Sequence, residues 1–291
     1  MITVIINPIS GGTKLSVARE RAELASAVLA SHGERGDVFV TERRGHAGDL
    51  ARHASSRGDR LVIAWGGDGT MNEVACALAR GPTPMALIPA GSGNGLAREL
   101  GISRQPRQAI VEALGATPRR LDAGELGGRL FFSIAGVGFD AHVADCLDRD
   151  QSGRRGFGAY VRIAVRELQA YRPLVYRIDE ATLARPALLI TLANSPQFGN
   201  GARIAPSARL DDGRLDLVVF ASSSRLRTVC AIPRLFVGGV SRLRSVTTRQ
   251  FERVTIASDA PMIFHVDGEA VQGGTRLEGR VHPGALNVCV R

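Results

Sequence analysis

The feature that most constrains this chain is a glycine-rich turn between an apolar run and a helical segment. The apolar residues 61–65 stop at Gly66-Gly67-Asp68-Gly69-Thr70, and a helix-like segment follows over 72–80. A strand that ends in glycines and leads into a helix brings backbone N–H groups against a phosphate. The carboxylate of Asp68 adds a group able to orient a metal ion or a hydroxyl. This turn therefore suggests nucleotide chemistry.

Two further turns repeat the arrangement. Asn7-Pro8-Ile9-Ser10-Gly11-Gly12 follows the apolar run 3–7, and Pro89-Ala90-Gly91-Ser92-Gly93-Asn94-Gly95 follows the run 85–89. Any one of these turns is equally well explained by glycine ending a strand for steric reasons. Because ligands of open α/β sheets bind outside the carboxyl ends of the strands, the three turns together predict one shared site. Their spacing is neither Walker A nor G-x-G-x-x-G, so a phosphate cradle here has a different design.

The period of the hydrophobic pattern changes near residue 120. Before it, strand signals at 3–7, 37–41, 61–65 and 85–89 alternate with helix signals at 15–30, 46–55, 72–80 and 96–100. This alternation predicts an α/β domain over 1–122 with a mainly parallel sheet. After it, short turn-bounded strand segments predict a β-rich domain over 123–280, an antiparallel sandwich or barrel. These strand candidates lie at 129–134, 174–178, 187–192, 214–220, 253–257, 261–266 and 285–290, with helix candidates at 156–171 and 226–238.

Positive charge is concentrated in arginine. The net charge is +9, and Lys14 is the only lysine. Genome composition explains that bias as well as function does, but the arginines also cluster along the chain in two segments, 149–172 and 225–253. Such clusters suit membrane lipid, nucleic acid or a phosphorylated ligand. Few aromatic residues are present and none interleaves with the arginines, which argues against single-stranded nucleic acid.

Cysteine and histidine give no metal or redox signature. The four cysteines, Cys76, Cys146, Cys230 and Cys289, form no C-x-x-C pair and are expected to be reduced thiols of a cytoplasmic protein. The six histidines form no H-E-x-x-H pattern and no convincing pair with cysteine or acid, so we expect surface or satisfied core positions. No apolar run approaches the roughly 20 residues of a membrane span, and residues 1–7 lack the features of a signal peptide.

Two acidic turns occur in the second half. Asp211-Asp212-Gly213 is able to hold a hard cation with help from nearby carbonyls, although a solvated type I turn is the favoured reading of these residues alone. Asp267-Gly268-Glu269 ends the apolar run 262–266 and offers a carboxylate that could accept a hydroxyl proton. Asp-Gly is also a favoured hairpin pair, and taken alone that explanation is the stronger one.

In order along the chain, these pieces resemble the diacylglycerol kinase catalytic-domain family, bacterial lipid kinases that are similar to sphingosine and ceramide kinases. The resemblance covers nearly the whole chain and is carried by motifs at strand ends and turns. These motifs are Asn7-Pro8 with Ser10-Gly11, Thr41 with Gly45-His46-Ala47, Gly66-Gly67-Asp68-Gly69-Thr70 with Asn72-Glu73, Pro89 with Gly91-Ser92-Gly93-Asn94, Phe132-Ser133 through Gly138-Phe139-Asp140-Ala141, Asn194, Phe198-Gly199-Asn200-Gly201, Ala205-Pro206, Asp211-Asp212-Gly213 with Leu215-Asp216, and Asp267-Gly268-Glu269.

The resemblance implies a two-domain enzyme with ATP in a cleft between the domains, Mg²⁺ as a cofactor, and a terminal strand, 281–291, that returns to the first domain. It implies ATP contacts from the motif residues of the first domain: Asn7, Pro8, Ser10, Gly11, Thr41, Gly66, Gly67, Asp68, Gly69, Thr70, Asn72, Glu73, Gly91, Ser92, Gly93 and Asn94.

By the same resemblance, Asp267 and Glu269 fall where the proton of the lipid hydroxyl is abstracted, and Asp68 lies near the phosphates and the catalytic magnesium. A structural magnesium site is implied at Asp212 with the carbonyls of Arg209 and Arg214, and Asp122 joins a magnesium–water network. The implied partners are a lipid substrate and, through the arginine-rich segments, the surface of an anionic membrane, without nucleic acid. The sequence leaves the oligomeric state open, a homodimer being one alternative.

Two positions depart from the family. Gly95 stands where bacterial members often carry aspartate, which removes an acid from the expected metal network, and Asn200 stands where a third glycine is common. Diacylglycerol is the favoured acceptor, with a sphingosine- or ceramide-type lipid as the alternative. NAD kinase shares the glycine turn, but its asparagine–glutamate pair lies well downstream, whereas Asn72-Glu73 directly abuts the turn here. A non-catalytic nucleotide-binding protein is the rival from another class, and the intact Asp267-Gly268-Glu269 argues against it.

Overall fold

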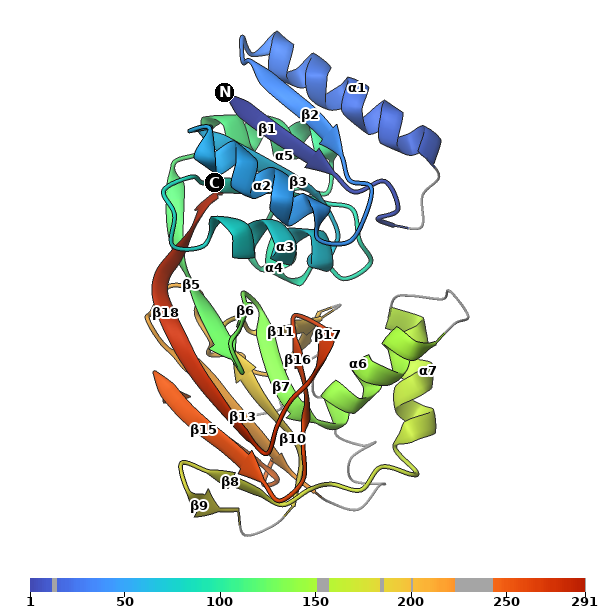
Figure 1. The fold of residues 1–291 in the computed structure, drawn as a ribbon, viewed down its shortest axis with the longest axis vertical. Coiled ribbons are helices and arrows are strands. Elements are labelled where there is room, and N and C mark those ends of the chain that lie inside the picture. The colour runs from blue at the N-terminus through green and yellow to red at the C-terminus, as the bar shows by residue number, and fades with distance from the viewer. Residues whose placement is uncertain (12–14, 151–156, 184–185, 200, 223–242, 291) are drawn as a thin grey trace. The chain divides into compact units, whose positions relative to one another are not determined.

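The structure, a computed structural model, describes residues 1–11, 15–150, 157–183, 186–199, 201–222 and 243–290 (Figure 1). The chain divides into two compact units. Unit 1 consists of Met1–Leu121 with Gly284–Arg291, and unit 2 consists of Asp122–Pro283. Within the described ranges, no helix is long and apolar enough to cross a membrane.

Unit 1 is a parallel sheet with helices on both faces (Figure 1). Its strand order is β2-β1-β3-β4, and the end of β18 lies beside β4, where Val288 pairs with Met85. The elements are β1 (Ile2–Ile6), α1 (Leu15–Ser31), β2 (Gly36–Val40), α2 (His46–Ser56), β3 (Leu61–Gly66), α3 (Asp68–Leu78), β4 (Met85–Pro89), α4 (Gly95–Glu99) and α5 (Pro106–Gly115). Helices α1 and α5 pack against one face, and α2 and α3 against the other.

The strands of unit 1 are apolar on both faces because both are covered. Alternate residues such as Val4 and Ile63 point to the side of α1 and α5, where they meet Val28 and Ile110 in one buried cluster. The register aligns the carboxyl ends of the strands, since Ile6 pairs with both Val40 and Trp65. All the loops that follow these strands therefore begin at one edge of the sheet.

Unit 2 is a β-sandwich. One sheet is antiparallel throughout, in the order β14-β13-β10-β7-β16-β17, and it faces β15, β8 and β9 together with β5, β6 and the first part of β18. The strands are β5 (Pro118–Leu126), β6 (Arg129–Phe131), β7 (Ile134–Gly138), β8 (Tyr176–Ile178), β9 (Ala181–Thr182), β10 (Ala187–Ala193), β11 (Gln197–Gly199), β12 (Ala202–Arg203), β13 (Leu215–Ala221), β14 (Val246–Phe251), β15 (Arg253–Ser258), β16 (Ile263–Val266), β17 (Glu269–Gln272) and β18 (Arg276–Cys289).

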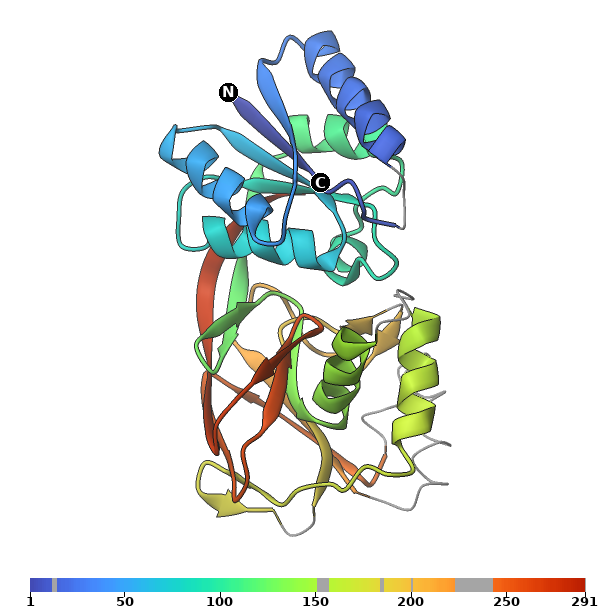
Figure 2. The same cartoon turned by 45° about the vertical axis from the view of Figure 1, so that its right-hand side comes forward.

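The core of unit 2 lies between the two layers. Val137, Leu192 and Leu217 from the antiparallel sheet join Ile256 and Leu277 from the other layer in one buried cluster. Two helices, α6 (Phe139–Arg149) and α7 (Phe157–Glu167), pack against each other, and α6 also contacts β16 and β17 (Figure 2). The expected combination of an N-terminal α/β domain and a C-terminal β-sandwich is thus confirmed.

Several element expectations were wrong in detail. The helix expected from residue 72 begins at Asp68, so the signature acid sits in the first helical turn and only Gly67 separates β3 from α3. The strand expected at 129–134 is two strands, because residues 132 and 133 turn to bond a distant carboxylate. The final strand begins at Arg276 instead of residue 285. The helix candidate at 226–238 lies outside the described residues.

Helices α5 and α6 were not expected. Helix α5 carries a usable signal, with proline in its first turn and Ala109, Ile110 and Ala113 on its buried side. Helix α6 is harder to read because two of its buried residues are acids, Asp140 and Asp145, which interrupt the apolar stripe.

Candidate functional site

The glycine-rich loops of unit 1 meet at the carboxyl edge of its sheet. The Gly67 N–H donates to Ser10 Oγ at 3.1 Å, which ties the loop after β3 to the loop after β1. Asn7 Nδ2 donates to Thr70 Oγ1 at 2.8 Å, so the first loop also contacts the first turn of α3. The expectation that these turns share one location is therefore met by direct contacts.

Glycine is required where these loops approach each other. A Cβ on Gly91 would lie 2.7 Å from Gly67 Cα, and one on Gly11, whose φ is +82°, would lie 2.6 Å from the Ala90 carbonyl oxygen. Real Cβ atoms essentially never come this close to backbone. The glycines thus let three loops pack backbone against backbone, which leaves their N–H groups close together at one edge.

Asp68 holds the third loop in place. Its Oδ2 accepts the Asn94 N–H and its Oδ1 accepts the Gly95 N–H, both at 2.8 Å. Asn94, buried and at φ +53°, closes the same loop because its Oδ1 accepts the Gly91 N–H at 2.9 Å. A Cβ on Gly93 would lie 2.5 Å from Asp68 Oδ2. Asp68 is therefore first of all an anchor for backbone N–H groups, and Gly95 supplies one of them.

The second loop joins this arrangement through α3. Glu73 Oε1 accepts the Gly45 N–H at 2.9 Å, at the residue that precedes α2. Thr41 follows β2 directly, and its N–H donates to the Ile6 carbonyl at 2.8 Å. Asn72 lies on the same helix turn as Glu73, where its Oδ1 accepts the Cys76 thiol at 3.4 Å. All four loops that sequence reasoning selected in unit 1 are linked by hydrogen bonds or close contact.

Arg21 is a supporting residue that sequence reasoning missed. From α1 its guanidinium donates to the carbonyls of Asn7 at 3.1 Å and Ser10 at 3.2 Å, and it lies over the Trp65 ring at 5.8 Å. Partial burial lowers the pKa of Arg21 from its ordinary value. The available signal was its position: Arg21 falls on the apolar stripe that Ala18 and Ala25 define, where a charged residue needs a partner.

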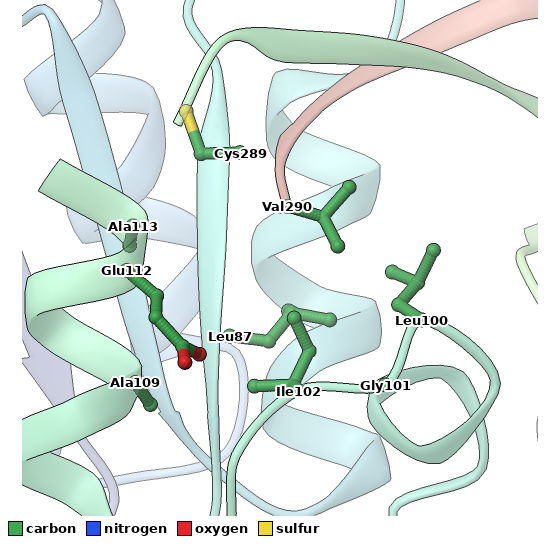
Figure 3. A pocket seen from close by; sticks show the side chains of 9 residues that line it. All are labelled: Leu87, Leu100, Gly101, Ile102, Ala109, Glu112, Ala113, Cys289 and Val290. Atoms are coloured by element: carbon green, nitrogen blue, oxygen red, sulfur yellow. The ribbon is translucent and has the colours of Figure 1, made fainter. Parts of the chain in front are cut away.

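A small cavity of unit 1 lies apart from these loops. Its volume is about 30 Å³, enough for a water molecule, and Cys289 and Glu112 are among the residues around it (Figure 3). None of its lining residues belongs to the four loops. The cavity is consequently not part of the candidate site.

In unit 2, the Asp267 carboxylate is held by backbone. Its Oδ2 accepts the Phe132 N–H at 2.9 Å, and its Oδ1 accepts the N–H groups of Ser133 at 2.8 Å and Ile134 at 3.1 Å. Asp267 and Gly268, at φ +47° and +88°, form the two-residue turn between β16 and β17. The hairpin reading of this motif is therefore right, and the turn also gives the carboxylate a fixed orientation.

Glu269 is partly exposed. It begins β17, and its carboxylate lies 3.9 Å from a guanidinium nitrogen of Arg129. About a third of the Glu269 side chain is exposed. At that distance and exposure the ion pair contributes little to stability.

Asn194 connects the Asp267 turn to Asp122. Its Nδ2 donates to the carbonyls of Asp122 and Phe132, both at 2.9 Å, and its N–H donates to the Ser133 carbonyl at 2.9 Å. The residue is 0% exposed, and its Oδ1 has no hydrogen-bond partner among the described residues. An unpartnered buried acceptor costs roughly 1–3 kcal/mol, so this oxygen marks a place for a water molecule or another donor.

Asp122 faces the Asp211-Asp212-Gly213 turn. Its buried carboxylate accepts the Gly213 N–H at 2.7 Å, and its own N–H donates to the Leu210 carbonyl at 2.7 Å. Asp212 is exposed, and its carboxylate accepts the Arg214 N–H at 3.1 Å and a Gln250 N–H at 3.2 Å. Asp122 and the turn expected to bind magnesium therefore lie together.

A third acid, Asp216, belongs to the sequence motif of this turn but was assigned no role from the sequence. It is 3% exposed, and Ser207 Oγ donates to it at 3.2 Å. Burial raises the pKa of Asp216, and the negative charge of Asp212 raises it further. Alternation along β13 places Asp216 opposite the sandwich-core residues Leu215 and Leu217, so the period alone could not have indicated its burial.

The arginine-rich segments are described only in part. Arg154, Arg155, Arg225, Arg227, Arg234 and Arg242 lie outside the described residues, as do Asn200 and Cys230. Three described arginines are exposed but paired with acids: Arg149 with Asp145, Arg162 with Asp150 and Arg166 with Glu167. Their charge is thus partly neutralised locally.

Three histidines pair with acids that are distant in the sequence, and one of them, His265, occupies a buried core position of the kind expected. His265 bonds the buried Asp140 at 3.1 Å, and His282 bonds Glu125 at 2.8 Å. His142 lies 3.0 Å from a Glu167 oxygen. The partners are separated by 25 to 157 residues, so no local pattern could reveal them.

Comparisons with known proteins agree with this architecture. The diacylglycerol kinase catalytic domain matches residues 1–126, and the YegS C-terminal NAD kinase beta sandwich-like domain matches residues 133–290. A protein of Pseudomonas fluorescens described as "Probable lipid kinase YegS-like" is 31% identical over 91% of this chain and 90% of its own length. A protein of the same description from Chromohalobacter salexigens is 36% identical over 65% of this chain and 63% of its own.

A solved structure of a diacylglycerol kinase from Bacillus anthracis covers 100% of this chain and 96% of its own, with a TM-score of 0.73 at 18% identity, a likeness that concerns the fold. The two matched domains account for most of the chain, and the Pseudomonas relative extends over nearly all of it. The chain therefore belongs to the family of lipid kinases built from a diacylglycerol kinase catalytic domain and a YegS-type C-terminal domain.

Proposed function

We propose that this protein transfers the γ-phosphoryl group of ATP to the hydroxyl of a lipid, with diacylglycerol as the acceptor and phosphatidic acid as the product. A sphingosine- or ceramide-type acceptor is the alternative. Family membership implies a kinase that acts on a lipid alcohol with ATP as the phosphate donor. The observation that carries the proposal is the double anchoring of the Gly91–Asn94 loop by Asp68, because it fixes a glycine-lined edge of backbone N–H groups.

On the nucleotide side, the motif residues of unit 1 bind and orient the triphosphate. Phosphoryl transfer depends on positioning and charge neutralisation more than on covalent chemistry of the protein. Packed glycine loops suit this task, since their N–H groups need no reorganisation during the reaction. The direct contacts Ser10–Gly67, Asn7–Thr70 and Glu73–Gly45 keep the loops of the four strands in one arrangement.

On the acceptor side, Asp267 receives the proton of the lipid hydroxyl, with Glu269 as its partner in the proposed catalytic pair. Three backbone N–H groups fix the orientation of the Asp267 carboxylate. A fixed carboxylate lowers the entropy cost of aligning the hydroxyl for attack. Because phosphoryl transfer depends mainly on positioning, turnover is proposed to require a carboxylate that both aligns the hydroxyl and takes its proton.

The Asp211-Asp212-Gly213 turn fits a magnesium ion. Mg²⁺ favours one or two carboxylates, carbonyl oxygens and several waters, and Asp212, the carbonyls of Arg209 and Arg214, and nearby Asp122 offer that donor set. The unpartnered Asn194 Oδ1 beside Asp122 is suited to a water of such a network. A bound magnesium at this turn would supply positive charge that offsets the acids, including the buried Asp216.

A second proposed role of unit 2 is peripheral docking on anionic membrane through the arginine-rich segments. Because Arg149, Arg162 and Arg166 already pair with acids, we expect binding to be weak and strongly salt-dependent. Co-sedimentation with vesicles of neutral or anionic lipid, at low and high salt, checks this. Binding that ignores both lipid charge and salt contradicts it.

Acceptor specificity is tested with radiolabelled ATP and Mg²⁺, offering diacylglycerol, ceramide, sphingosine and NAD in separate reactions. We expect labelled phosphatidic acid. A labelled product from sphingosine or ceramide alone would move the assignment to the alternative lipid class, and labelled NADP would overturn the lipid assignment. If ATP binds and none of the four acceptors is labelled, a non-catalytic nucleotide-binding role is favoured.

The base assignment is tested by Asp267→Asn beside Glu269→Gln. We expect Asp267→Asn to abolish turnover and to leave the ATP dissociation constant nearly unchanged, measured by calorimetry. Substantial turnover in Asp267→Asn would refute the assignment.

A further inference from the structure

Helices α6 and α7 bring three metal-ligating side chains together. His142 and Cys146 stand one turn apart on α6, and Glu167 ends α7. His142 Nε2 lies 3.0 Å from Glu167 Oε2 and 3.7 Å from Cys146 Sγ, and the three ligand atoms all lie within 4.8 Å of one another. It is the one group of three or more such residues in the part of the chain that the structure describes.

The spacing of these atoms matches neighbouring ligands of one tetrahedral ion. With bonds of about 2.3 Å to sulfur and about 2.0–2.1 Å to nitrogen or oxygen, tetrahedral geometry separates the ligand atoms by roughly 3.3–3.6 Å. The observed 3.0 Å and 3.7 Å lie on either side of that range. The third pair, Cys146 Sγ and Glu167 Oε2, lies within 4.8 Å, so side-chain rotations that move these atoms by no more than about 1.5 Å would complete the geometry.

Neighbouring residues already orient two of the ligands. Arg166 Nε donates to Glu167 Oε1 at 2.9 Å, so the other oxygen, Oε2, is the one directed at His142. The His142 ring lies 5.3 Å from the Tyr171 ring, centroid to centroid, and that contact restricts its rotation. Such outer contacts commonly hold metal ligands in place. His142 and Glu167 keep 31% and 20% of their side-chain surface exposed, so an ion can enter from solvent.

We propose that His142 Nε2, Cys146 Sγ and Glu167 Oε2 bind a zinc ion that ties α6 to α7, with a water molecule as the fourth ligand. Binding replaces the thiol proton of Cys146 by the metal and places the remaining ring proton of His142 on Nδ1, so protons are released to solvent. The mixed sulfur, nitrogen and oxygen donors favour zinc over Mg²⁺, which takes oxygen ligands. This site does not depend on the proposed lipid kinase reaction and shares no residue with the candidate nucleotide or acid-turn residues.

The test uses the full-length protein, reduced and freed of metal by a chelator, and titrates it with Co²⁺ as a spectroscopic substitute for zinc. We expect one Co²⁺ per chain with the near-ultraviolet absorption of a cobalt–thiolate bond, displaced by Zn²⁺ and unaffected by excess Mg²⁺. Cys146→Ser should remove that absorption, and His142→Gln should weaken Zn²⁺ binding at least ~10-fold, as loss of a ligand does at least as much as loss of an outer contact.

Cys76→Ser and His53→Gln serve as matched controls, because both residues are exposed and lie outside the cluster. Both should bind like the wild type, and metal-free thermal unfolding should show that all four variants fold. The proposal is overturned if the wild type shows no cobalt–thiolate absorption, or if Cys146→Ser retains it. It is equally overturned if Cys76→Ser lowers Zn²⁺ affinity as much as Cys146→Ser does.

Discussion

Replacing Gly91 by alanine should separate two loops that the fold requires to touch. The new Cβ would lie 2.7 Å from Gly67 Cα and 3.0 Å from Asn94 Oδ1, whereas ordinary contact begins at 3.4 Å. The loops after β3 and β4 would therefore have to move apart by about 0.7 Å, the difference between 3.4 and 2.7 Å. Both neighbours are firmly held, since Gly67 bonds Ser10 and Asn94 bonds Asp68.

Two effects follow from that displacement. Forcing extra atoms into a packed region costs roughly 1–3 kcal/mol of stability. A misplacement of about 1 Å in a catalytic arrangement can lower the rate by roughly 10²-fold, so we expect Gly91→Ala to lower kcat/KM by about 10–10²-fold. The loss should appear in ATP binding as well as in turnover, because the loop is proposed to hold the phosphates before the reaction.

The assay combines urea unfolding, calorimetric ATP binding and steady-state kinetics on the full chain. Gly115→Ala is the matched control: Gly115 lies in α5 of the same unit, and its added Cβ would meet nothing within 4 Å. We expect that variant to keep wild-type kinetics and to be as stable or slightly more stable. If Gly91→Ala and Gly115→Ala behave alike in both stability and ATP affinity, the close packing of the loops is not what positions the nucleotide.

Three further outcomes are expected. Asp68→Asn should lower stability by roughly 1–3 kcal/mol, because one of the two N–H groups it accepts loses its partner, and kcat/KM should fall with it; unchanged urea unfolding would contradict the anchoring role. Gly69→Ala adds a Cβ that meets no protein atom within 4 Å, so it should leave thermal unfolding unchanged yet weaken ATP binding in calorimetry if the phosphates approach this residue as proposed. Arg57 bonds Asp59 through two nitrogens at 2.9 and 3.0 Å, which lowers the pKa of Asp59 below its ordinary value. The stabilisation from this pair is therefore fully present above the ordinary pKa of aspartate and is lost as pH falls through the lowered pKa. Arg57→Met should destabilise the protein more at pH near 7 than in acid, and an equal loss at both pH values, measured by urea unfolding, would contradict the pairing.

The local pattern of the sequence predicted the strands and loops of unit 1 well. Glycine, proline and asparagine after an apolar run favour turn conformations by their own backbone preferences. Gly11 and Asn94 do adopt positive φ in the loops they were expected to form. The predicted start of α3 was four residues too late because Asp68-Gly69-Thr70 resembles a turn in composition. These residues form the first helical turn, where the negative charge of Asp68 is favourable at the positive end of the helix dipole.

The contacts that organise unit 2 could not be read in the same way. Asp267 bonds N–H groups 133 to 135 residues earlier in the chain, and Asn194 bonds the Asp122 carbonyl 72 residues away. Nothing in the local pattern specifies such partners, because they depend on which strands become neighbours. The resemblance selected these residues, and the sheet order β10-β7-β16 explains why they meet.

Asp68 and Asp267 share a property that changes how their loss should be interpreted. Each carboxylate accepts backbone N–H groups of a loop, two in the first case and three in the second. A change to asparagine removes charge and one acceptor position together, so lost activity reports loop disorder as readily as lost acid–base chemistry. Glu269 is the informative comparison, since it begins β17, about a third of its side chain is exposed, and its carboxylate lies 3.9 Å from an Arg129 guanidinium nitrogen. A Glu269→Gln variant that loses turnover without losing stability would place proton transfer at the Asp267-Gly268-Glu269 hairpin. Neither aspartate variant can do so alone, because each also removes an acceptor of backbone N–H groups.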